Sequence, residues 1–372
     1  MRWWGAFLLV AAGCGDDVHG GPPTPDAALP DGSNLPDGAA MPDGTPSGPL
    51  LRVSGNHIVD GNGQLVRLFG VNRSGTEYAC IHGNGIFDGP SDDASLAAIR
   101  TWKANAVRVP MNEDCWLAIN GVQAQYAGAT YQQAIADYVT RLLAHGLYPI
   151  LELHWSAPGG TAAMGQNPMP DRDHSIDFWT QVAMRFKSDR RVVLELFNEP
   201  FPDSNQDTMA AWTCWRDGGT CPGQSYAAAG MQELVTAVRN AGAENVILLG
   251  GVQYSNALSR WLEFKPNDAT GNLAAAWHIY NFNSCNSQSC YDGAPAGVAA
   301  QVPLVATEIG EDDCAGGFIS PLMTWLDGKQ SSYLGWTWDT WGGCLVLITD
   351  YNGTPNGAYG QAFESHLAQV AP

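Results

Sequence analysis

The sequence predicts an α/β fold, a closed (β/α)8 TIM barrel, and two observations carry that prediction. From Leu50 onward, short apolar runs alternate with segments of helical period, as in βα units around a parallel sheet. Eight such runs occur over roughly 320 residues, which suits a barrel. No glycine-rich phosphate loop follows the first run, so an open dinucleotide-binding sheet is disfavoured.

Each element of the barrel can be assigned a range. The strands are expected at 65–71, 106–110, 148–154, 192–198, 245–250, 274–279, 304–308 and 333–338. Helices are expected between them at 92–103, 131–144, 175–187, 224–241 and 319–327. Residues 51–59 precede the first strand and are expected to form a hairpin that closes the barrel floor.

The first 48 residues have a different character. Residues 1–13 contain an apolar run of about ten residues, too short to span a bilayer but typical of a signal peptide. The run ends in Ala11-Ala12-Gly13-Cys14, which resembles the bacterial lipobox, although Ala11 stands where the pattern usually has Leu. We expect a secreted lipoprotein, anchored to the outer surface or a membrane through Cys14; a plain cleaved signal with a chance cysteine is the alternative. Residues 14–48, rich in Pro, Asp and Gly, are expected to be a disordered tether before the 49–372 domain.

The charge and the aromatic content narrow the possible ligands. The chain has 37 acidic and 18 basic residues, for a net charge of -19. Such a field repels phosphate backbones, so nucleic acid is an unsuitable ligand and a neutral substrate fits better. The 14 Trp and 12 Tyr include rings that could stack on sugar faces, beside those that only pack the core.

The cysteines predict disulfides. Without Cys14, eight of the nine remain, an even number in a chain expected to be exported. Short spacing suggests Cys214 with Cys221 and Cys285 with Cys290. The pairing among the other four stays open: Cys80, Cys115, Cys314 and Cys344. A structural zinc is disfavoured because no pair has C-x₂-C spacing and no nearby His completes a set.

Polar residues occur at the carboxyl ends of six of the eight expected strands. Barrel enzymes place their chemistry at these ends, which converge on one face. Burying two carboxylates, an arginine and two histidines there costs several kcal/mol unless they pair or react. The residues are Arg108, His154, Asn198 with Glu199, His278 with Tyr280, Glu308, and Trp336.

The strings around these residues resemble those of a known family. VRVP, LELHW, VVLELFNEP, WHIY, VATEIG and SYLGWTW are similar, in order, to the motifs of glycoside hydrolase family 5, the cellulase family of clan A. The resemblance implies a retaining endo-glycosidase with Glu199 as acid/base and Glu308 as nucleophile. It also implies supporting roles: Arg108 and Tyr280 bonded to the nucleophile, Asn198 holding the sugar 2-hydroxyl, His154 and His278 lining the subsite, and Trp336 as its stacking floor.

The implied chemistry suits these residue types. Retention requires a carboxylic acid that protonates the leaving oxygen and a carboxylate about 5 to 5.5 Å away that attacks the sugar. Acids on the fourth and seventh strands can face each other at that distance. The nucleophile must stay ionised, and Arg108 would supply the positive charge that favours this state.

Other acids and tryptophans have simpler interpretations. Glu152 and Glu195 alternate in phase with His154 and Glu199, so we expect them inside the barrel, one paired with Arg108. The acids that follow strands two and seven are expected to face solvent: Glu113, Asp114, Glu311, Asp312 and Asp313. Asp171 and Asp173 are expected to cap the next helix. Four tryptophans could extend a sugar-stacking track: Trp155, Trp179, Trp277 and Trp341.

The expected substrate is β-1,4-glucan, and mannan or xyloglucan is the alternative within the same family. A non-catalytic carbohydrate-binding surface protein is a second alternative, against which both intact carboxylates argue. A metal-dependent barrel hydrolase using His154 and His278 would be expected to carry an H-x-H pair on its first strand, and this sequence has none there. We therefore expect a monomer that cuts polysaccharide with no metal and no cofactor.

Overall fold

A computed structural model describes residues 50–371. The predicted signal peptide (1–13), Cys14 and the predicted tether (14–48) lie outside the described residues. Within the described part of the chain, no helix is both long enough and apolar enough to cross a membrane.

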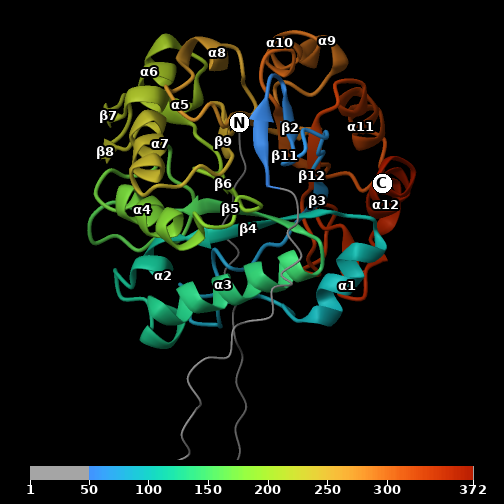
Figure 1. Ribbon diagram of the computed structural model, residues 1–372, viewed down its shortest axis with the longest axis horizontal. Helices are drawn as coiled ribbons and strands as arrows, with labels where there is room; N and C mark the ends of the chain where they lie inside the picture. Colours follow the sequence, from blue (N-terminus) through green and yellow to red (C-terminus); the bar gives the residue numbers. More distant parts are fainter. Residues whose placement is uncertain (1–49, 372) are drawn as a thin grey trace, which may run out of the picture. The chain divides into compact units, whose positions relative to one another are not determined.

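The described residues form a closed barrel of eight parallel strands, as predicted (Figure 1). Each strand pairs with the next along the chain, and the last pairs with the first. In order around the barrel the strands are β3 (Phe69–Asn72), β4 (Ala106–Asn112), β5 (Tyr148–Trp155), β6 (Val193–Glu195), β9 (Ile247–Gly250), β10 (Leu273–Tyr280), β11 (Leu304–Gly310) and β12 (Ser332–Gly335).

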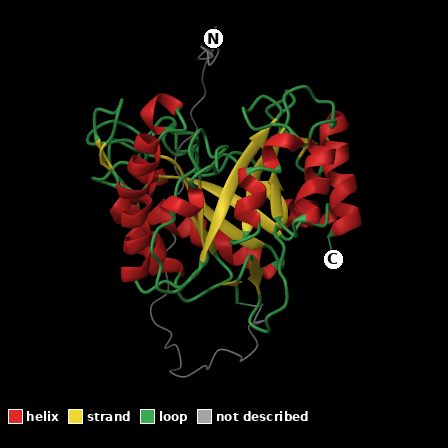
Figure 2. Cartoon of the chain, turned by 90° about the horizontal axis from the view of Figure 1, so that it is seen from above, coloured by secondary structure: helices red, strands yellow, loops and turns green. Residues whose placement is uncertain are grey.

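Helices surround the strands on the outside (Figure 2). The longer ones are α1 (Asp93–Thr101), α3 (Ala129–Ala144), α4 (Ser175–Phe186), α6 (Met209–Asp217), α7 (Met231–Asn240), α11 (Ile319–Gly328) and α12 (Gly357–Val370). The shorter ones are α2 (Glu113–Leu117), α5 (Pro202–Asn205), α8 (Trp261–Phe264), α9 (Gln288–Tyr291), α10 (Ala294–Ala299) and the 3₁₀ turn η1 (Ala124–Tyr126). The longer helices bury apolar residues against the strands, and this packing covers the outer side of the barrel.

The predicted hairpin closes the end of the barrel where the strands begin. It consists of β1 (Arg52–Ser54) and β2 (His57–Val59), paired antiparallel. Leu51 and Ile58 are buried in one apolar cluster with inward residues from the starts of the strands, among them Ala106, Ile150 and Val305. The polar residues predicted from the strand ends lie at the opposite end of the barrel, where the strands finish.

Several expected elements have other bounds in the structure; the strand expected at 192–198, for example, is β6, which covers only Val193–Glu195. The helix expected at 224–241 begins only at Met231, because β8 (Ala227–Ala228) pairs antiparallel with β7 (Gly219–Thr220). The strand expected at 65–71 begins at Phe69, because Leu65 bridges to Val59 and extends the hairpin. A further two-stranded sheet, β13 (Ile348–Asp350) with β14 (Thr354–Pro355), precedes α12.

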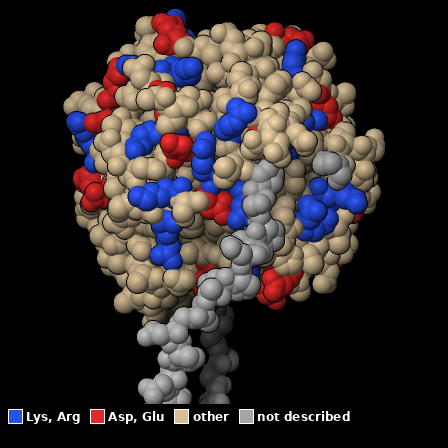
Figure 3. All heavy atoms as spheres, viewed as in Figure 1, with Lys and Arg blue, Asp and Glu red and all other residues tan. Residues whose placement is uncertain are grey.

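Charged side chains are scattered over the face shown in Figure 3, mostly singly or in small groups among uncharged residues. On this face the acidic excess of the sequence is therefore not gathered into one patch. On this face, repulsion of anionic ligands would come from the net negative charge of the protein rather than from a local cluster of acidic residues.

Four disulfides form within residues 50–371. The two bridges predicted from short spacing, Cys214–Cys221 and Cys285–Cys290, are confirmed. The remaining cysteines pair over longer separations, Cys80 with Cys115 and Cys314 with Cys344. These last two bridges join loops of neighbouring βα units, a pairing that sequence spacing left open.

All eight cysteines of the barrel domain are therefore expected to be oxidised, each bridge contributing about 2 to 4 kcal/mol. Thiol titration of the unfolded but unreduced domain should find essentially no free thiol. Several reactive thiols per molecule would contradict the four bridges.

Candidate active site

The eight residues predicted from the strand ends lie at one end of the barrel, most of them joined by hydrogen bonds. Arg108 lies on β4, His154 on β5, His278 and Tyr280 on β10, and Glu308 on β11. The remaining three follow the ends of their strands: Asn198 and Glu199 after β6, and Trp336 after β12.

Arg108 is the centre of the network and is fully buried. Its Nε donates to Glu195 Oε2 at 2.6 Å, its Nη1 to Glu308 Oε1 at 2.7 Å, and its Nη2 to Asn198 Oδ1 at 2.9 Å. Glu152 Oε2 lies 3.5 Å from Nη2. Burial by itself lowers the pKa of Arg108, but the three surrounding carboxylates more than offset this and raise it. The guanidinium therefore stays charged, and Glu195 is its closest scaffold partner, as expected.

Glu308 is held by two donors. Besides Arg108, Tyr280 donates its hydroxyl to Glu308 Oε2 at 2.6 Å. Burial, and then the charges of Glu308 and Glu199, raise the pKa of Tyr280 well above its usual range. Tyr280 therefore keeps its proton and remains a donor. With one strong donor on each oxygen, the carboxylate of Glu308 has a fixed orientation.

Glu199 is held more loosely than Glu308. Its Oε1 lies 2.9 Å from His278 Nδ1, and its side chain is 16% exposed, against 4% for that of Glu308. One carboxylate oxygen from each of the two glutamates and one nitrogen of His278 lie within 4.8 Å of one another. The site therefore brings two carboxyl groups of unequal freedom close together.

His278 lies between carboxylates. Its Nε2 is 3.1 Å from Thr307 Oγ1, and that hydroxyl donates to Glu195 Oε1 at 2.8 Å. Burial lowers the pKa of His278, but Glu308, Glu195 and Glu199 together raise it to about 9. His278 is therefore an imidazolium at neutral pH.

This protonation state predicts a pH dependence of stability. Because the pKa of His278 rises from 6.5 to about 9 on folding, its contribution is fully present below pH 6.5 and is lost as pH rises through about 9. As the pH rises from 6.5 to about 9, the free energy of unfolding of the wild type should fall by on the order of a few kcal/mol. The free energy of unfolding of His278→Gln should not show this fall. Urea unfolding of both proteins across this range measures the difference. Parallel pH profiles would contradict it.

His154 and Trp336 form a stacked pair of rings in the site. Their rings stack with centroids 5.6 Å apart and planes 13° apart. His154 Nδ1 lies 2.9 Å from Glu152 Oε2, and its Nε2 lies 3.4 Å from Asn198 Nδ2. Burial lowers the pKa of His154, so this ring is neutral, unlike His278. Trp336 remains partly exposed.

Two members of the network were not predicted. Asn72, the last residue of β3, accepts from Arg108 Nη1 at 3.0 Å and donates to Thr307 O at 2.9 Å. Thr307 links His278 to Glu195. Asn72 could have been found from its place just after the expected first strand, whereas the side chain of Thr307 carries no charge or ring that would mark it.

The expectation that Glu113, Asp114 and Glu311 face solvent is wrong, because all three are fully buried. Glu311 accepts backbone N–H groups of Phe318 and Ile319 at 3.0 and 3.2 Å, ahead of α11. Its carboxylate satisfies loop amides that would otherwise be buried without partners. Asp312 and Asp313 are exposed, as expected.

Glu113 and Asp114 hold the long loop after β5. Glu113 accepts from Ala157 N at 3.0 Å and from Ser175 Oγ at 2.6 Å, and Asp114 accepts from Ala163 N at 2.8 Å. Asp171 accepts from His174 N at 2.9 Å just before α4, and Asp173 accepts from Gly159 N at 2.7 Å. The N-cap of α4 is His174 and no side chain caps this helix, so the expected capping by Asp171 and Asp173 is wrong. These acids position loops and do not enter the network of Arg108.

The proposed sugar track is shorter than expected. Trp179 and Trp277 are fully buried, and their indole N–H groups donate to Leu196 O and Asn256 O. Trp277 neighbours the inward His278 on β10, so it must point outward into the helical layer. Trp341 is 50% exposed and Trp155 is partly exposed, so these two can still reach a ligand.

Among residues 50–371, two groups of side chains have donor atoms close enough to hold a metal ion. One is Glu199, His278 and Glu308, and the other is Asp171, Asp173 and His174. In the first, the charged Arg108 occupies one oxygen of Glu308 and the imidazolium of His278 offers no lone pair. In this donor set a cation would therefore compete with Arg108 for Glu308 and with a proton for His278.

Two neighbouring carboxyl groups at the carboxyl ends of a parallel barrel, one bonded to Arg108 and Tyr280 and the other partly exposed, are typical of the glycoside hydrolases. Comparison with known families gives the particular one. A model described as cellulase (glycosyl hydrolase family 5) matches residues 59–342. The chain therefore belongs to glycosyl hydrolase family 5, as its motifs predicted.

Similar proteins include both glucan- and mannan-cleaving enzymes by name. The chain is 24% identical to Endoglucanase E-5 of Thermobifida fusca, covering 88% of this chain and 66% of that protein. It is 26% identical to a mannan endo-1,4-beta-mannosidase of Streptomyces lividans, covering 82% and 70%. Its fold is similar to beta-glucanase SdGluc5_26A of Saccharophagus degradans, with TM-score 0.67, 19% identity and coverage of 87% and 94%. The mannanase catalytic domain of Streptomyces sp. SirexAA-E gives TM-score 0.61, 22% identity and coverage of 90% and 94%.

Proposed function

We propose that the protein is a retaining endo-glycosidase that hydrolyses β-1,4-linked polysaccharide, with Glu308 as nucleophile and Glu199 as acid/base. The observation that carries this proposal is the asymmetry of the two glutamates. Glu308 is fixed by Arg108 and Tyr280, as an ionised nucleophile should be, whereas Glu199 is partly exposed. One oxygen of each lies within 4.8 Å of one of the other, so the two carboxyl groups are nearer than the roughly 6.5 to 9.5 Å that inverting enzymes use, which supports retention.

The reaction then has two steps. Glu308 attacks the anomeric carbon while Glu199 gives its proton to the leaving oxygen, so the glycosidic bond breaks and a glycosyl ester forms. Glu199, now a carboxylate, removes a proton from water, and that water displaces Glu308 from the sugar. The enzyme returns to its starting protonation, and two inversions give net retention.

The remaining residues hold the sugar and the charges. Arg108 fixes the side-chain oxygen of Asn198, and the Asn198 amide nitrogen lies 3.4 Å from His154 Nε2, so its second N–H can donate to the sugar 2-hydroxyl. Trp336, braced by His154, offers its partly exposed ring as the stacking floor. His278, as an imidazolium, stabilises the carboxylate that Glu199 becomes after it has given up its proton.

The proposed substrate is β-1,4-glucan, with mannan or xyloglucan as the alternative. A similar protein named endoglucanase and another named mannosidase support both possibilities. A panel of β-1,4-glucan, mannan, xyloglucan and xylan, with analysis of the products, separates them. Release of reducing ends from soluble carboxymethyl cellulose or glucomannan would also discard the alternative of an idle carbohydrate-binding protein, whereas no release from any polymer would refute the proposed activity.

We also propose that the enzyme is an exported monomer anchored through lipidated Cys14, on the basis of the sequence that surrounds this residue. Cys14→Ser should free it from membranes without loss of specific activity, because the tether separates the anchor from the barrel. Fractionation of cells that express each form, with activity assays on both fractions, measures this. Finding the wild-type protein already unlipidated would refute the anchor.

A further inference from the structure

A buried acid that the proposed mechanism does not use lies beside His154. Glu152, on β5, is fully buried, and its Oε2 lies 2.9 Å from His154 Nδ1. The same oxygen lies 3.5 Å from Arg108 Nη2. By contrast, Arg108 lies 2.6 Å from Glu195 and 2.7 Å from Glu308. The ring of His154, rather than the guanidinium of Arg108, is therefore the closer partner of Glu152.

Four side chains close a ring of polar contacts. Arg108 Nη2 donates to Asn198 Oδ1 at 2.9 Å, and the nitrogen of that amide lies 3.4 Å from His154 Nε2. The other ring nitrogen of His154 contacts Glu152 Oε2, and this oxygen faces Arg108 again. Because a guanidinium can only donate, the direction of every bond in the ring follows from Arg108.

The donor and acceptor roles can be assigned in order around the ring. Arg108 must face the oxygen of the Asn198 amide, so the amide nitrogen faces His154. That nitrogen can only donate, so His154 Nε2 must accept. Burial lowers the pKa of His154 and keeps its ring neutral, so the ring has a single N–H. This proton is therefore on Nδ1, and Glu152 Oε2 accepts it.

Glu152 can accept this hydrogen bond whether it is ionised or protonated. Burial raises the pKa of Glu152 well above its usual range, an effect that the charge of Arg108 opposes. Two donors face Oε2, whereas Oε1 has no hydrogen-bond partner among residues 50–371. A proton held by Glu152 would therefore be on Oε1, and Oε2 would remain an acceptor.

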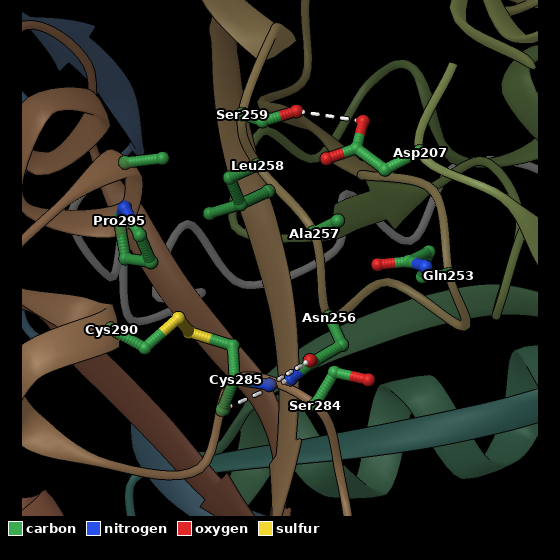
Figure 4. A pocket seen from close by; sticks show the side chains of 11 residues that line it. Asp207, Gln253, Asn256, Ala257, Leu258, Ser259, Ser284, Cys285, Cys290 and Pro295 are labelled. Atoms are coloured by element: carbon green, nitrogen blue, oxygen red, sulfur yellow. Dashed lines mark hydrogen bonds between the residues drawn. A yellow bond between two sulfur atoms is a disulfide. The ribbon is translucent and has the colours of Figure 1, made fainter.

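Other contacts hold the backbone of Asn198. Asn198 N donates to Leu153 O at 3.0 Å, and Ser255 Oγ donates to Asn198 O at 2.8 Å. Ser255 lies in the loop after β9, where the next residue, Asn256, accepts from Cys285 N at 2.9 Å (Figure 4). Because the backbone of Asn198 is held in this way, the direction of its amide depends on the partners of its side chain.

We propose that Glu152 is a positioning residue that fixes the proton of His154 on Nδ1 and thereby aims the Asn198 amide at the sugar 2-hydroxyl. This inference rests on the proposed function, in which Asn198 donates to that hydroxyl. With Nε2 as acceptor, His154 binds one N–H of the amide and leaves the second for the sugar. With the ring proton on Nε2 instead, two donors would face each other and the amide would turn away.

The proposed role has a specific kinetic signature. Hydrogen bonds to the 2-hydroxyl strengthen in the transition state of glycoside hydrolysis. An interaction made mainly in the transition state contributes to kcat rather than to KM. Loss of the acceptor on Glu152 should therefore lower kcat, and only for substrates that have a 2-hydroxyl.

Two variants at this position test the role. Glu152→Met removes the acceptor at similar volume, whereas Glu152→Gln keeps an oxygen for His154 Nδ1 and Arg108. The substrates are an aryl β-cellobioside and its analogue without the 2-hydroxyl on the sugar that bears the aryl group, or the manno-counterparts if the polymer panel favours mannan. Relative to the wild type on the same substrate, Glu152→Met should lose about 100-fold in kcat with the 2-hydroxyl and at most about threefold without it. Glu152→Gln should stay within about fivefold of the wild type on both.

Nitrogen NMR of the wild type with ¹⁵N-labelled histidine observes the proton of His154 directly. The signals of His154 are identified by their loss in His154→Gln. At neutral pH, His154 should show a protonated Nδ1 and an unprotonated Nε2. The reverse would overturn the proposal, and this result decides alone if Glu152→Met does not fold.

The kinetic outcomes have distinct meanings. Equal losses of Glu152→Met on the two substrates would overturn the positioning role, because the defect would not depend on the 2-hydroxyl. A Glu152→Gln variant as slow as Glu152→Met would also overturn it, because the acceptor oxygen would not be what matters. If the wild type hydrolyses neither substrate nor any polymer, the proposed function itself fails, and the positioning role fails with it.

Discussion

The Glu308→Ala variant is expected to lose hydrolytic activity by roughly 10⁴- to 10⁶-fold, because no covalent glycosyl-enzyme can form without the nucleophile. Added azide or formate should restore part of the turnover by entering the space that the carboxylate leaves. The product of that reaction should have the inverted configuration, since a single displacement replaces two. Polarimetry or NMR of the product formed with azide measures this.

A control separates this effect from general damage. Asp313→Ala removes an exposed acid from the loop that follows the same strand, and it should keep wild-type activity. Because Glu308 also pairs with buried Arg108, circular dichroism should show that Glu308→Ala is folded. A folded Glu308→Ala variant with near-wild-type activity would exclude Glu308 as the nucleophile.

The Glu199→Ala variant is expected to depend strongly on the leaving group. On natural polysaccharide, whose leaving oxygen requires a proton, it should lose roughly 10²- to 10⁴-fold in rate. On substrates with a good leaving group, the covalent intermediate should still form and then accumulate, because no base activates water for the second step. Azide should release it as a glycosyl azide of retained configuration.

The opposite stereochemistry of the two azide products distinguishes the two roles. Stopped-flow measurements on an aryl glycoside should show a burst followed by slow turnover for Glu199→Ala. Equal losses on activated and natural substrates, with no burst, would contradict the acid/base role of Glu199.

The barrel and most of the polar network could be predicted because both depend on local patterns. Eight apolar runs with helical crossovers determine the strand order, and the ends of parallel strands converge wherever the barrel closes. Arg108, His154 and His278 could therefore be placed together from their positions in the strands. Their partners inside the barrel, Glu152 and Glu195, follow from the same alternation of side chains.

The features that the sequence did not predict depend on contacts between segments far apart in the chain. Glu113 and Glu311 are buried because loop amides far along the chain need acceptors, and no local pattern reports where those amides lie. Trp179 and Trp277 are of the residue type that stacks on sugar rings, but both are fully buried in the helical layer. The pairing of Cys314 with Cys344 likewise depends on two loops that meet only once the barrel has closed.

The most direct test of the proposed mechanism is a mechanism-based 2-fluoro glycoside that traps the covalent intermediate, followed by peptide mass spectrometry. The covalent glycosyl-enzyme should form, and its hydrolysis should be slow enough for the labelled enzyme to be isolated. The label is expected on Glu308 and nowhere else. A label on Glu199 or Glu311, or a wild-type enzyme that inverts the anomeric centre, would contradict the proposed division of roles.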